Sequence, residues 1–387
     1  MKKILALVLA LCMVFALCAC GAKTEAPAAE APAAEAPAAE APAAEAPAFK
    51  VAMITDYGDI TDQSFNQTTY EACKEFCDEN SIEFKYYKPA GDSTAERVAM
   101  VDAAVADGFN VIVMPGFAFG ETVVQTVELY PDVYFVALDV SQGDLGDFVL
   151  PENVFCAVYQ EELCGYMAGY AAVKLGYTKL GFLGGMAVPA VVRYGYGFVQ
   201  GADAAAAELG LTDVTMNYAY GNQFSGDADI TAAMDTWYSA GTEVVFACGG
   251  GIYTSAAEAA AKVDGKVIGV DVDQAGIIDG GYGEGMTVTS AMKGLAPTVE
   301  HMLTEVAAGN FSNYGGKIET LGLVSGDDPE ANYVQIPMES TQWSDSFTQD
   351  DYKALVKDMF DGKITVSNDI SAMPSTSITV NEYGNIK

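Results

Sequence analysis

From residue 50 onward, short runs of β-branched and other apolar residues alternate with longer stretches in which apolar residues recur every three or four positions. The short runs predict strands and the longer stretches predict amphipathic helices, because the two structures differ in the period of their apolar face. The predicted strands are residues 51–55, 83–87, 110–114, 133–138, 154–157, 179–183, 214–218, 243–247, 266–270 and 286–290. The predicted helices between them include residues 95–106, 161–174, 191–209 and 229–239.

Strands separated by helices are typical of βαβ units, whose parallel sheets are covered by helices on both faces. So many strands over this length fit two doubly wound lobes better than one large sheet. We therefore predict an α/β protein whose chain first passes from one lobe to the other near Tyr159. The expected lobes are an N-terminal lobe of residues 49–158 with about 287–330, and a C-terminal lobe of residues 159–286 with about 331–387.

The last part of the chain, from about Gly309, has a less regular pattern. It predicts one helix at residues 349–361 and a strand at residues 363–367. We expect this segment to lace the two lobes together.

The first residues have the three parts of a bacterial lipoprotein signal. Met1-Lys2-Lys3 is basic, and the apolar run of residues 4–17 is shorter than the roughly 20 residues of a membrane-spanning helix. The run ends in Leu-Cys-Ala-Cys-Gly, which resembles a lipobox. We expect residues 1–19 to be a cleaved signal peptide and Cys20 to be the lipidated N-terminus of a protein on the extracytoplasmic face of the cell membrane.

Residues 20–48 predict an extended tether, because a Glu-Ala-Pro-Ala-Ala repeat places a proline at every fifth position and so prevents a helix. Fully stretched, the repeat of residues 25–48 reaches on the order of 70 Å. The chain carries 53 acidic residues against 19 lysines and arginines. This balance argues against a nucleic-acid partner, which requires basic patches. It also disfavours adsorption to anionic lipid, so a covalent lipid is the expected membrane attachment.

Cysteine and histidine usage limits the chemistry of the domain. The five cysteines beyond residue 20 are expected to be small buried apolar residues: Cys73, Cys77, Cys156, Cys164 and Cys248. His301 is the single histidine of the chain and lies in a predicted helix. Ser-His or Cys-His catalysis and a histidine metal centre are therefore not expected, and neither is a cofactor.

Three aspartates directly follow predicted strands: Asp56, Asp139 and Asp271. One such residue alone is commonly a helix cap or a turn residue. However, ligands of open parallel sheets bind beyond the carboxyl ends of the strands. Three acids in equivalent positions therefore predict a polar cleft that binds hydroxyl groups or ring nitrogens.

Other residues of the same loops fit a ligand with a flat group. Phe65 and Phe224 each lie in a polar loop, one in each predicted lobe, and either ring could instead fold back onto the core. Together they could clamp an aromatic group between the lobes. The glycines of residues 249–251 would let the backbone approach a ligand closely. Lys293 follows a predicted strand in a chain that has few cations.

These residues carry a resemblance to a known family. Residues 55–66, TDYGDITDQSFN, resemble the D-x-G-x-x-x-D-x-S-F-N signature of the basic membrane protein family. Residues 268–274 and 289–293 resemble its second and third signatures. The family comprises substrate-binding lipoproteins of ABC transporters, including purine nucleoside receptors. The resemblance covers about residues 50–370 and implies a type I periplasmic-binding-protein fold, in which two doubly wound lobes are joined by a three-segment hinge.

The resemblance also implies roles for individual residues. Phe65 and Phe224 would sandwich a purine ring, and Asp139 would bind the edge of the base. The ribose and neighbouring polar atoms would be held by Asp56, Asn66, Asp271 and Lys293, with Gly250 offering its backbone. The second acid that the family usually has in its first signature is replaced here by Thr61.

The expected function is that of a monomeric binding protein, not an enzyme, which delivers a nucleoside to an ABC permease and its ATPase. Three alternatives remain open at this point. The same fold could bind a sugar, a flavin or another heterocycle, or it could serve a signalling receptor without transport. The chain could also be an exported nucleoside hydrolase, in which Asp56, Asp59 and Asp62 form a calcium or catalytic cluster.

Overall fold

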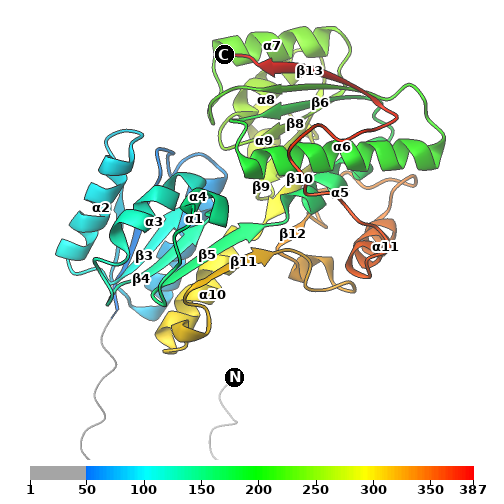
Figure 1. Cartoon of the computed structure of the whole chain (residues 1–387). Coiled ribbons are helices and arrows are strands. Elements are labelled where there is room, and N and C mark those ends of the chain that lie inside the picture. The colour runs from blue at the N-terminus through cyan, green and yellow to red at the C-terminus, as the bar shows by residue number, and fades with distance from the viewer. Residues whose placement is uncertain (1–48) are drawn as a thin grey trace, which may run out of the picture. The chain divides into compact units, whose positions relative to one another are not determined.

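The computed structural model describes residues 49–387, so the predictions for Cys20, the signal peptide 1–19 and the tether 20–48 lie outside the described residues. The first of two sheets is entirely parallel and has the strand order β11-β5-β4-β3-β1-β2 (Figure 1). Its strands are β1 (Val51–Ile54), β2 (Phe84–Tyr87), β3 (Val111–Pro115), β4 (Tyr134–Leu138), β5 (Val154–Tyr159) and β11 (Lys317–Leu321).

The second sheet has the order β12-β10-β9-β8-β6-β7-β13, and only the short edge strand β12 is antiparallel to its neighbour. Its strands are β6 (Lys179–Gly184), β7 (Thr215–Tyr220), β8 (Val244–Cys248), β9 (Lys266–Asp271), β10 (Thr287–Lys293), β12 (Val334–Gln335) and β13 (Thr379–Asn385). We refer to each sheet with the helices that cover it as the first and the second lobe. The predicted α/β class with two parallel-sheet lobes is confirmed.

Helices cover both faces of each sheet, as βαβ units require. The helices are α1 (Phe65–Asn80), α2 (Thr94–Ala106), α3 (Gly120–Thr126), α4 (Gln142–Leu145), α5 (Glu161–Lys174), α6 (Pro189–Leu209), α7 (Ala228–Ser239), α8 (Tyr253–Ala260), α9 (Ala275–Tyr282), α10 (Leu295–Ala307) and α11 (Gln349–Phe360). Within residues 49–387, none of these helices is both long and apolar enough to cross a membrane.

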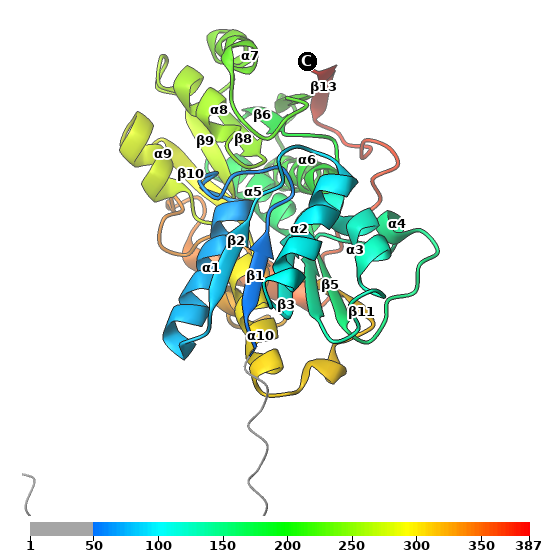
Figure 2. The ribbon, with the colours of Figure 1, turned by 90° about the vertical axis from the view of Figure 1, so that its left-hand side faces the viewer.

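The side chains of strand β1 alternate between the two faces of the sheet, and both faces are buried. Val51 and Met53 pack into the core under α1 and α10, whereas Ala52 and Ile54 pack into the core under α2 and α3. All four side chains are fully buried, so the strand reads as a continuous apolar run. Figure 2 shows α1 and α2 on the two sides of this strand.

Helices α5 and α6 of the second lobe pack unusually closely because glycines face the partner helix. A Cβ atom at Gly169 would lie 2.1 Å from the carbonyl oxygen of Phe198, and one at Gly201 would lie 2.0 Å from that of Tyr166. Gly165 and Gly197 face the partner backbone at similar distances. The contact fixes the first residues of α5 against the first turns of α6, which matters for the charged residues described below.

Three chain segments connect the lobes: β5 to α5, β10 to α10, and β11 to β12. They lie side by side and are joined by backbone hydrogen bonds. The amide of Gln160 donates to the carbonyl of Leu321 at 3.0 Å, and the amide of Gly294 donates to the carbonyl of Tyr333 at 2.7 Å. The amide of Tyr333 in turn donates to Gly322 at 3.0 Å. This is the three-segment hinge that the fold implies.

Two predictions about the C-terminal half are wrong. The chain returns to the first lobe after Lys293 and not near residue 287, because β10 pairs with β9 of the second sheet. Residues 363–367 form no strand. The side-chain amide of Gln200 takes the place of a neighbouring strand. It accepts a hydrogen bond from the N–H of Ser367 at 2.9 Å and donates one to the carbonyl of Ser367 at 3.0 Å. The C-terminal edge strand β13 was not predicted.

Candidate functional site

A cavity of about 760 Å³ lies where loops from the carboxyl ends of both sheets meet. Its wall combines residues of the β1–α1, β3–α3 and β4–α4 loops of the first lobe with residues of the β6–α6, β7–α7 and β8–α8 loops of the second. All eight residues predicted to bind ligand line it: Asp56, Phe65, Asn66, Asp139, Phe224, Gly250, Asp271 and Lys293. The strand-end rule therefore located the cavity correctly, while the binding roles of these residues remain predictions.

Asp56 follows β1 and is held by the backbone of its own loop. Its Oδ1 atom accepts hydrogen bonds from the amides of Tyr57 and Gly58, at 2.6 and 2.7 Å. Gly116, with a φ of +124°, leaves room for the other oxygen, since a Cβ atom there would lie 2.7 Å from Asp56 Oδ2. Burial raises the pKa of Asp56, although the two backbone N–H groups oppose the shift.

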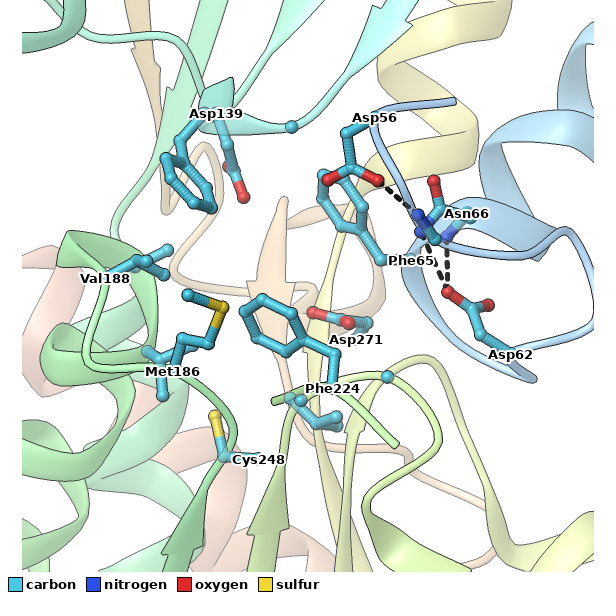
Figure 3. Close-up of a pocket in the computed structure, with 18 of the residues that line it drawn as sticks. Asp56, Asp62, Phe65, Asn66, Asp139, Met186, Val188, Phe224, Cys248 and Asp271 are labelled. Atoms are coloured by element: carbon cyan, nitrogen blue, oxygen red, sulfur yellow. Dashed lines mark hydrogen bonds between the residues drawn. The ribbon is translucent and has the colours of Figure 1, made fainter. Parts of the chain in front are cut away.

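Asp62 was predicted only as a member of the alternative hydrolase cluster, yet it organises the start of α1. Its Oδ1 atom accepts from the amides of Ser64 and Gln67, both at 3.0 Å. Its Oδ2 atom accepts from the backbone and the side-chain amide of Asn66, at 3.0 and 3.1 Å (Figure 3). These bonds fix Phe65 and Asn66 at the cavity wall. The Oδ1 atom of Asn66 is buried without a hydrogen-bond partner among the described residues.

Lys293, Asp139, Glu161 and Arg193 form a chain of ion pairs, which we call the charge cluster. The Nζ atom of Lys293 lies 2.7 Å from Asp139 Oδ2 and 3.3 Å from Glu161 Oε1. The Nε atom of Arg193 donates to Glu161 Oε2 at 2.6 Å. The Lys293 and Glu161 side chains are almost completely buried, at 2% and 0% exposure. Glu161, the first residue of α5, therefore links two cations that line the cavity.

Burial and ion pairing shift the pKa values of Asp139 and Lys293 in opposite directions. Burial raises the pKa of Asp139 to about 6, although Lys293 opposes the shift. Burial alone would lower the pKa of Lys293, but the carboxylates of Asp139 and Glu161 outweigh it and raise that pKa. The Lys293 ammonium also lies 5.0 Å from the centroid of the Phe65 ring, within cation–π range. Asp139 Oδ1 is buried and has no hydrogen-bond partner in residues 49–387.

Asp139 and Asp271 share a backbone conformation that the strand pattern did not reveal. Both have positive φ, 60° and 65°, in the left-handed region that aspartate tolerates better than most residues. The Asp271 carboxylate accepts from Tyr194 at 3.1 Å and from Ser64 of the other lobe at 2.6 Å. Asp271 therefore joins the two lobes in addition to lining the cavity.

Phe224 is the ring that the second lobe contributes. Its carbonyl accepts from the amide of Gly251 at 2.8 Å, which ties the β7–α7 loop to the glycine-rich β8–α8 loop. Its ring lies on Gly185, where a Cβ atom would approach Phe224 Cδ1 to 2.4 Å. Figure 3 shows Phe65 and Phe224 directed into one space, with Asp56, Asp139 and Asp271 around it. The structure thus brings together one aromatic ring from each lobe.

The lobes touch at two further points around the cavity. The side-chain amide of Gln274 donates to the carbonyl of Gln63 at 2.9 Å, and the Tyr57 hydroxyl donates to the sulfur of Met186 at 3.2 Å. Met186 and Arg193 line the cavity and were not predicted to do so. Met186 follows a predicted strand but has no charged or strongly polar group that would mark it, and Arg193 lies in a predicted helix.

The cysteines and the acidic residues of the alternative hydrolase cluster have separate environments in the structure. All five cysteines of the described residues are unpaired and buried, as predicted. Within residues 49–387 no three His, Cys, Asp or Glu side chains are grouped so that they could hold a metal ion. The three acids of the proposed hydrolase cluster instead have separate partners. Asp59 binds Lys88 and Thr61 on the exposed side of its loop, while Asp62 holds α1 and Asp56 binds its own loop.

Comparison with known proteins gives consistent results. Residues 49–357 match the family model described as ABC transporter substrate-binding protein PnrA-like. The chain is 27% identical over 334 residues to the ABC transporter nucleoside-binding protein BmpA of Lactococcus lactis, covering 82% of this chain and 88% of that protein. It is 29% identical over 285 residues to basic membrane protein B of Borreliella burgdorferi, covering 72% and 79%. An ABC transporter solute-binding protein from Aeropyrum pernix has a similar fold, with a TM-score of 0.64 and 21% identity over 83% of this chain and 88% of that one.

Proposed function

The chain belongs to the family of PnrA-like ABC transporter substrate-binding proteins, and on this basis we propose that it binds a purine nucleoside between its lobes and delivers it to a permease. The observation that carries the proposal is the placement of Phe65 and Phe224, one from each lobe, on the wall of one cavity with three strand-end aspartates. A flat base fits between two rings, and hydroxyl-rich ribose fits carboxylate acceptors. The name of the Lactococcus lactis relative supports the same ligand class.

The residues of the cavity supply enough interaction energy for this role. Stacking of a base on an aromatic ring contributes about 1–3 kcal/mol. A hydrogen bond to a charged group contributes roughly 1.5–3 kcal/mol. Two stacking faces and two or three carboxylate bonds together sum to about 5–15 kcal/mol, a range that includes the roughly 8 kcal/mol of micromolar binding.

Each predicted residue has a role in this proposal. Phe65 and Phe224 hold the base, and Asp139 binds its edge. Asp56, Asn66 and Asp271 bind the ribose. Lys293 acts mainly through Asp139, because its ammonium is already held by two carboxylates, and Gly250 shapes the loop that carries Phe224.

Attachment and partners follow from the same proposal. A lipid on Cys20 would hold the protein at the extracytoplasmic face of the membrane, and residues 20–48 would let it reach a permease served by an ATPase. A Cys20→Ser variant should appear in the culture medium, while the unaltered chain should remain in the membrane fraction. Equal distribution of the two would contradict lipid anchoring.

We assign no catalytic role to the cavity, and the chain should act as a monomer. Incubation of the protein with inosine should release no hypoxanthine, whereas appearance of the free base would favour the exported hydrolase. Calorimetric titration with inosine, guanosine, adenosine and ribose tests the ligand class. The nucleosides should bind with micromolar or tighter affinity, and ribose should bind far more weakly. Equal binding of ribose would favour a sugar receptor.

A further inference from the structure

Arg193 lines the cavity and has hydrogen-bond donors without a partner among the described residues. Its Nε atom is bonded to Glu161 at 2.6 Å, and no other hydrogen bond of its side chain is found among residues 49–387. The side chain is 19% exposed and lines the cavity. Both terminal nitrogens therefore remain available to a ligand. Because a guanidinium group only donates, the group that faces it must offer acceptors.

The orientation of this donor pair is fixed. Glu161 is fully buried, and its second oxygen is held by Lys293 at 3.3 Å. The close glycine contact between α5 and α6 leaves little freedom for Glu161 and Arg193 to move relative to each other. A guanidinium held through Nε presents its two remaining nitrogens as a planar fork.

The same charge cluster ends in a free acceptor. Lys293 occupies Oδ2 of Asp139, while Oδ1 has no partner among the described residues and is buried. Asp139 and Arg193 both line the cavity and are linked through Lys293 and Glu161. The cluster thus offers the ligand two neighbouring donors from Arg193 and one acceptor from Asp139.

We infer that Arg193 and Asp139 together select the 6-oxopurine nucleosides, guanosine and inosine, over adenosine. The inference rests on the proposed nucleoside-binding function and assigns Arg193 as a ligand-contacting specificity residue. Along one edge, a 6-oxopurine presents the acceptor N7, the acceptor O6 and the donor N1–H. Arginine bonded to both N7 and O6 is a common way for proteins to recognise guanine. Asp139 Oδ1 then accepts from N1–H.

Adenosine does not fit this pattern. Along the same edge it presents the acceptor N7, the donor N6–H₂ and the acceptor N1. Its amino group would face the Arg193 donors, and its N1 would face the Asp139 carboxylate. Two of the three positions would be mismatched, and buried polar groups left without partners are costly.

The test is titration calorimetry of the full chain with guanosine, inosine, adenosine and GMP. The main variant combines Arg193→Met with Glu161→Gln, so that removing the guanidinium leaves no buried carboxylate without its partner. The amide oxygen introduced by Glu161→Gln can still accept from Lys293. A second variant, Arg193→Lys, keeps the positive charge but removes the planar fork. The control combines Lys262→Met with Asp235→Asn, an ion pair of the same lobe that lies outside the cavity wall.

The unaltered chain should bind guanosine and inosine about 10- to 100-fold more tightly than adenosine, the span of one or two charge-assisted hydrogen bonds. Both Arg193 variants should lose most of this preference, and the control should retain it. Equal affinity for all three nucleosides would overturn the inference and leave the proposed function standing. Tighter binding of GMP than of guanosine, lost in the Arg193 variants, would also overturn it, because Arg193 would then be a phosphate ligand. Failure of every nucleoside to bind would overturn the proposed function itself.

Discussion

The ammonium group of Lys293 lies 2.7 Å from the carboxylate of Asp139, although Lys293 ends a strand of the second sheet and Asp139 follows a strand of the first. The ion pair therefore crosses between the lobes, and Lys293 is the last residue before the chain enters the hinge. Glu161 is the first residue after another hinge segment, and its carboxylate holds the same ammonium group. The charges that line the cavity are thus placed by the segments about which the lobes would move.

Loss of the Lys293 charge should destabilise the fold strongly. In Lys293→Met the carboxylates of Asp139 and Glu161 stay buried without this cation, and breaking a buried pair typically costs about 3–5 kcal/mol. The free energy of unfolding in urea should fall by that amount, and adding Asp139→Asn should restore part of it. Lys74→Met, which breaks an exposed pair with Asp78, should cause no measurable loss. A Lys293→Met protein as stable as the unaltered chain would contradict the burial of the Lys293 ion pairs.

Removal of either ring should weaken nucleoside binding. Phe65→Ala and Phe224→Ala should each raise the Kd for inosine about 5- to 100-fold, because each variant loses one stacking face. Phe360→Ala is the matched control, since this ring is 48% exposed and lies outside the cavity wall. Calorimetric titration compares the three variants. Loss of affinity from one ring but not the other would indicate a ligand held by a single lobe.

Binding should depend on pH through Asp139. The carboxylate must be ionised to accept a hydrogen bond from the base, and burial raises its pKa to about 6 in the free protein. As pH falls below about 6 the protonated form increases, so the Kd for inosine should rise by up to about tenfold per pH unit. Above that pH the affinity should be constant. Burial also raises the pKa of nearby Glu162 to about 7, so the comparison is with Asp139→Asn, whose weaker binding should lack the step near pH 6.

Close packing of α5 on α6 should matter for stability. Gly169→Ala places a methyl group 2.1 Å from the carbonyl oxygen of Phe198, and such overpacking costs about 1–3 kcal/mol. Gly276→Ala in α9 is the control, since nothing lies within 4 Å of the added atom. It should be neutral or stabilise the protein by up to about 1 kcal/mol, the difference in helix propensity. Urea unfolding separates the two, and equal stability would contradict the helix contact.

The position of the cavity could be predicted from the sequence because the residues that mark it directly follow predicted strands. A strand that ends in Asp56 or Asp139 is visible in the order of residues, and parallel sheets bring strand ends together by topology. Glu161 and Arg193 were missed for the opposite reason. Each lies in a helical stretch, where a charged residue normally faces solvent, and their ion pair joins two helices that approach closely at glycines. The side of the hinge on which β10 lies depends on pairing with β9, which no local pattern specifies.

The most direct test of the central claim is a crystal structure of the protein grown with inosine. We predict one nucleoside in the cavity, with its base between Phe65 and Phe224 and the base edge within hydrogen-bond distance of Asp139. A nucleoside bound to one lobe only, or outside the cavity between the lobes, would contradict it.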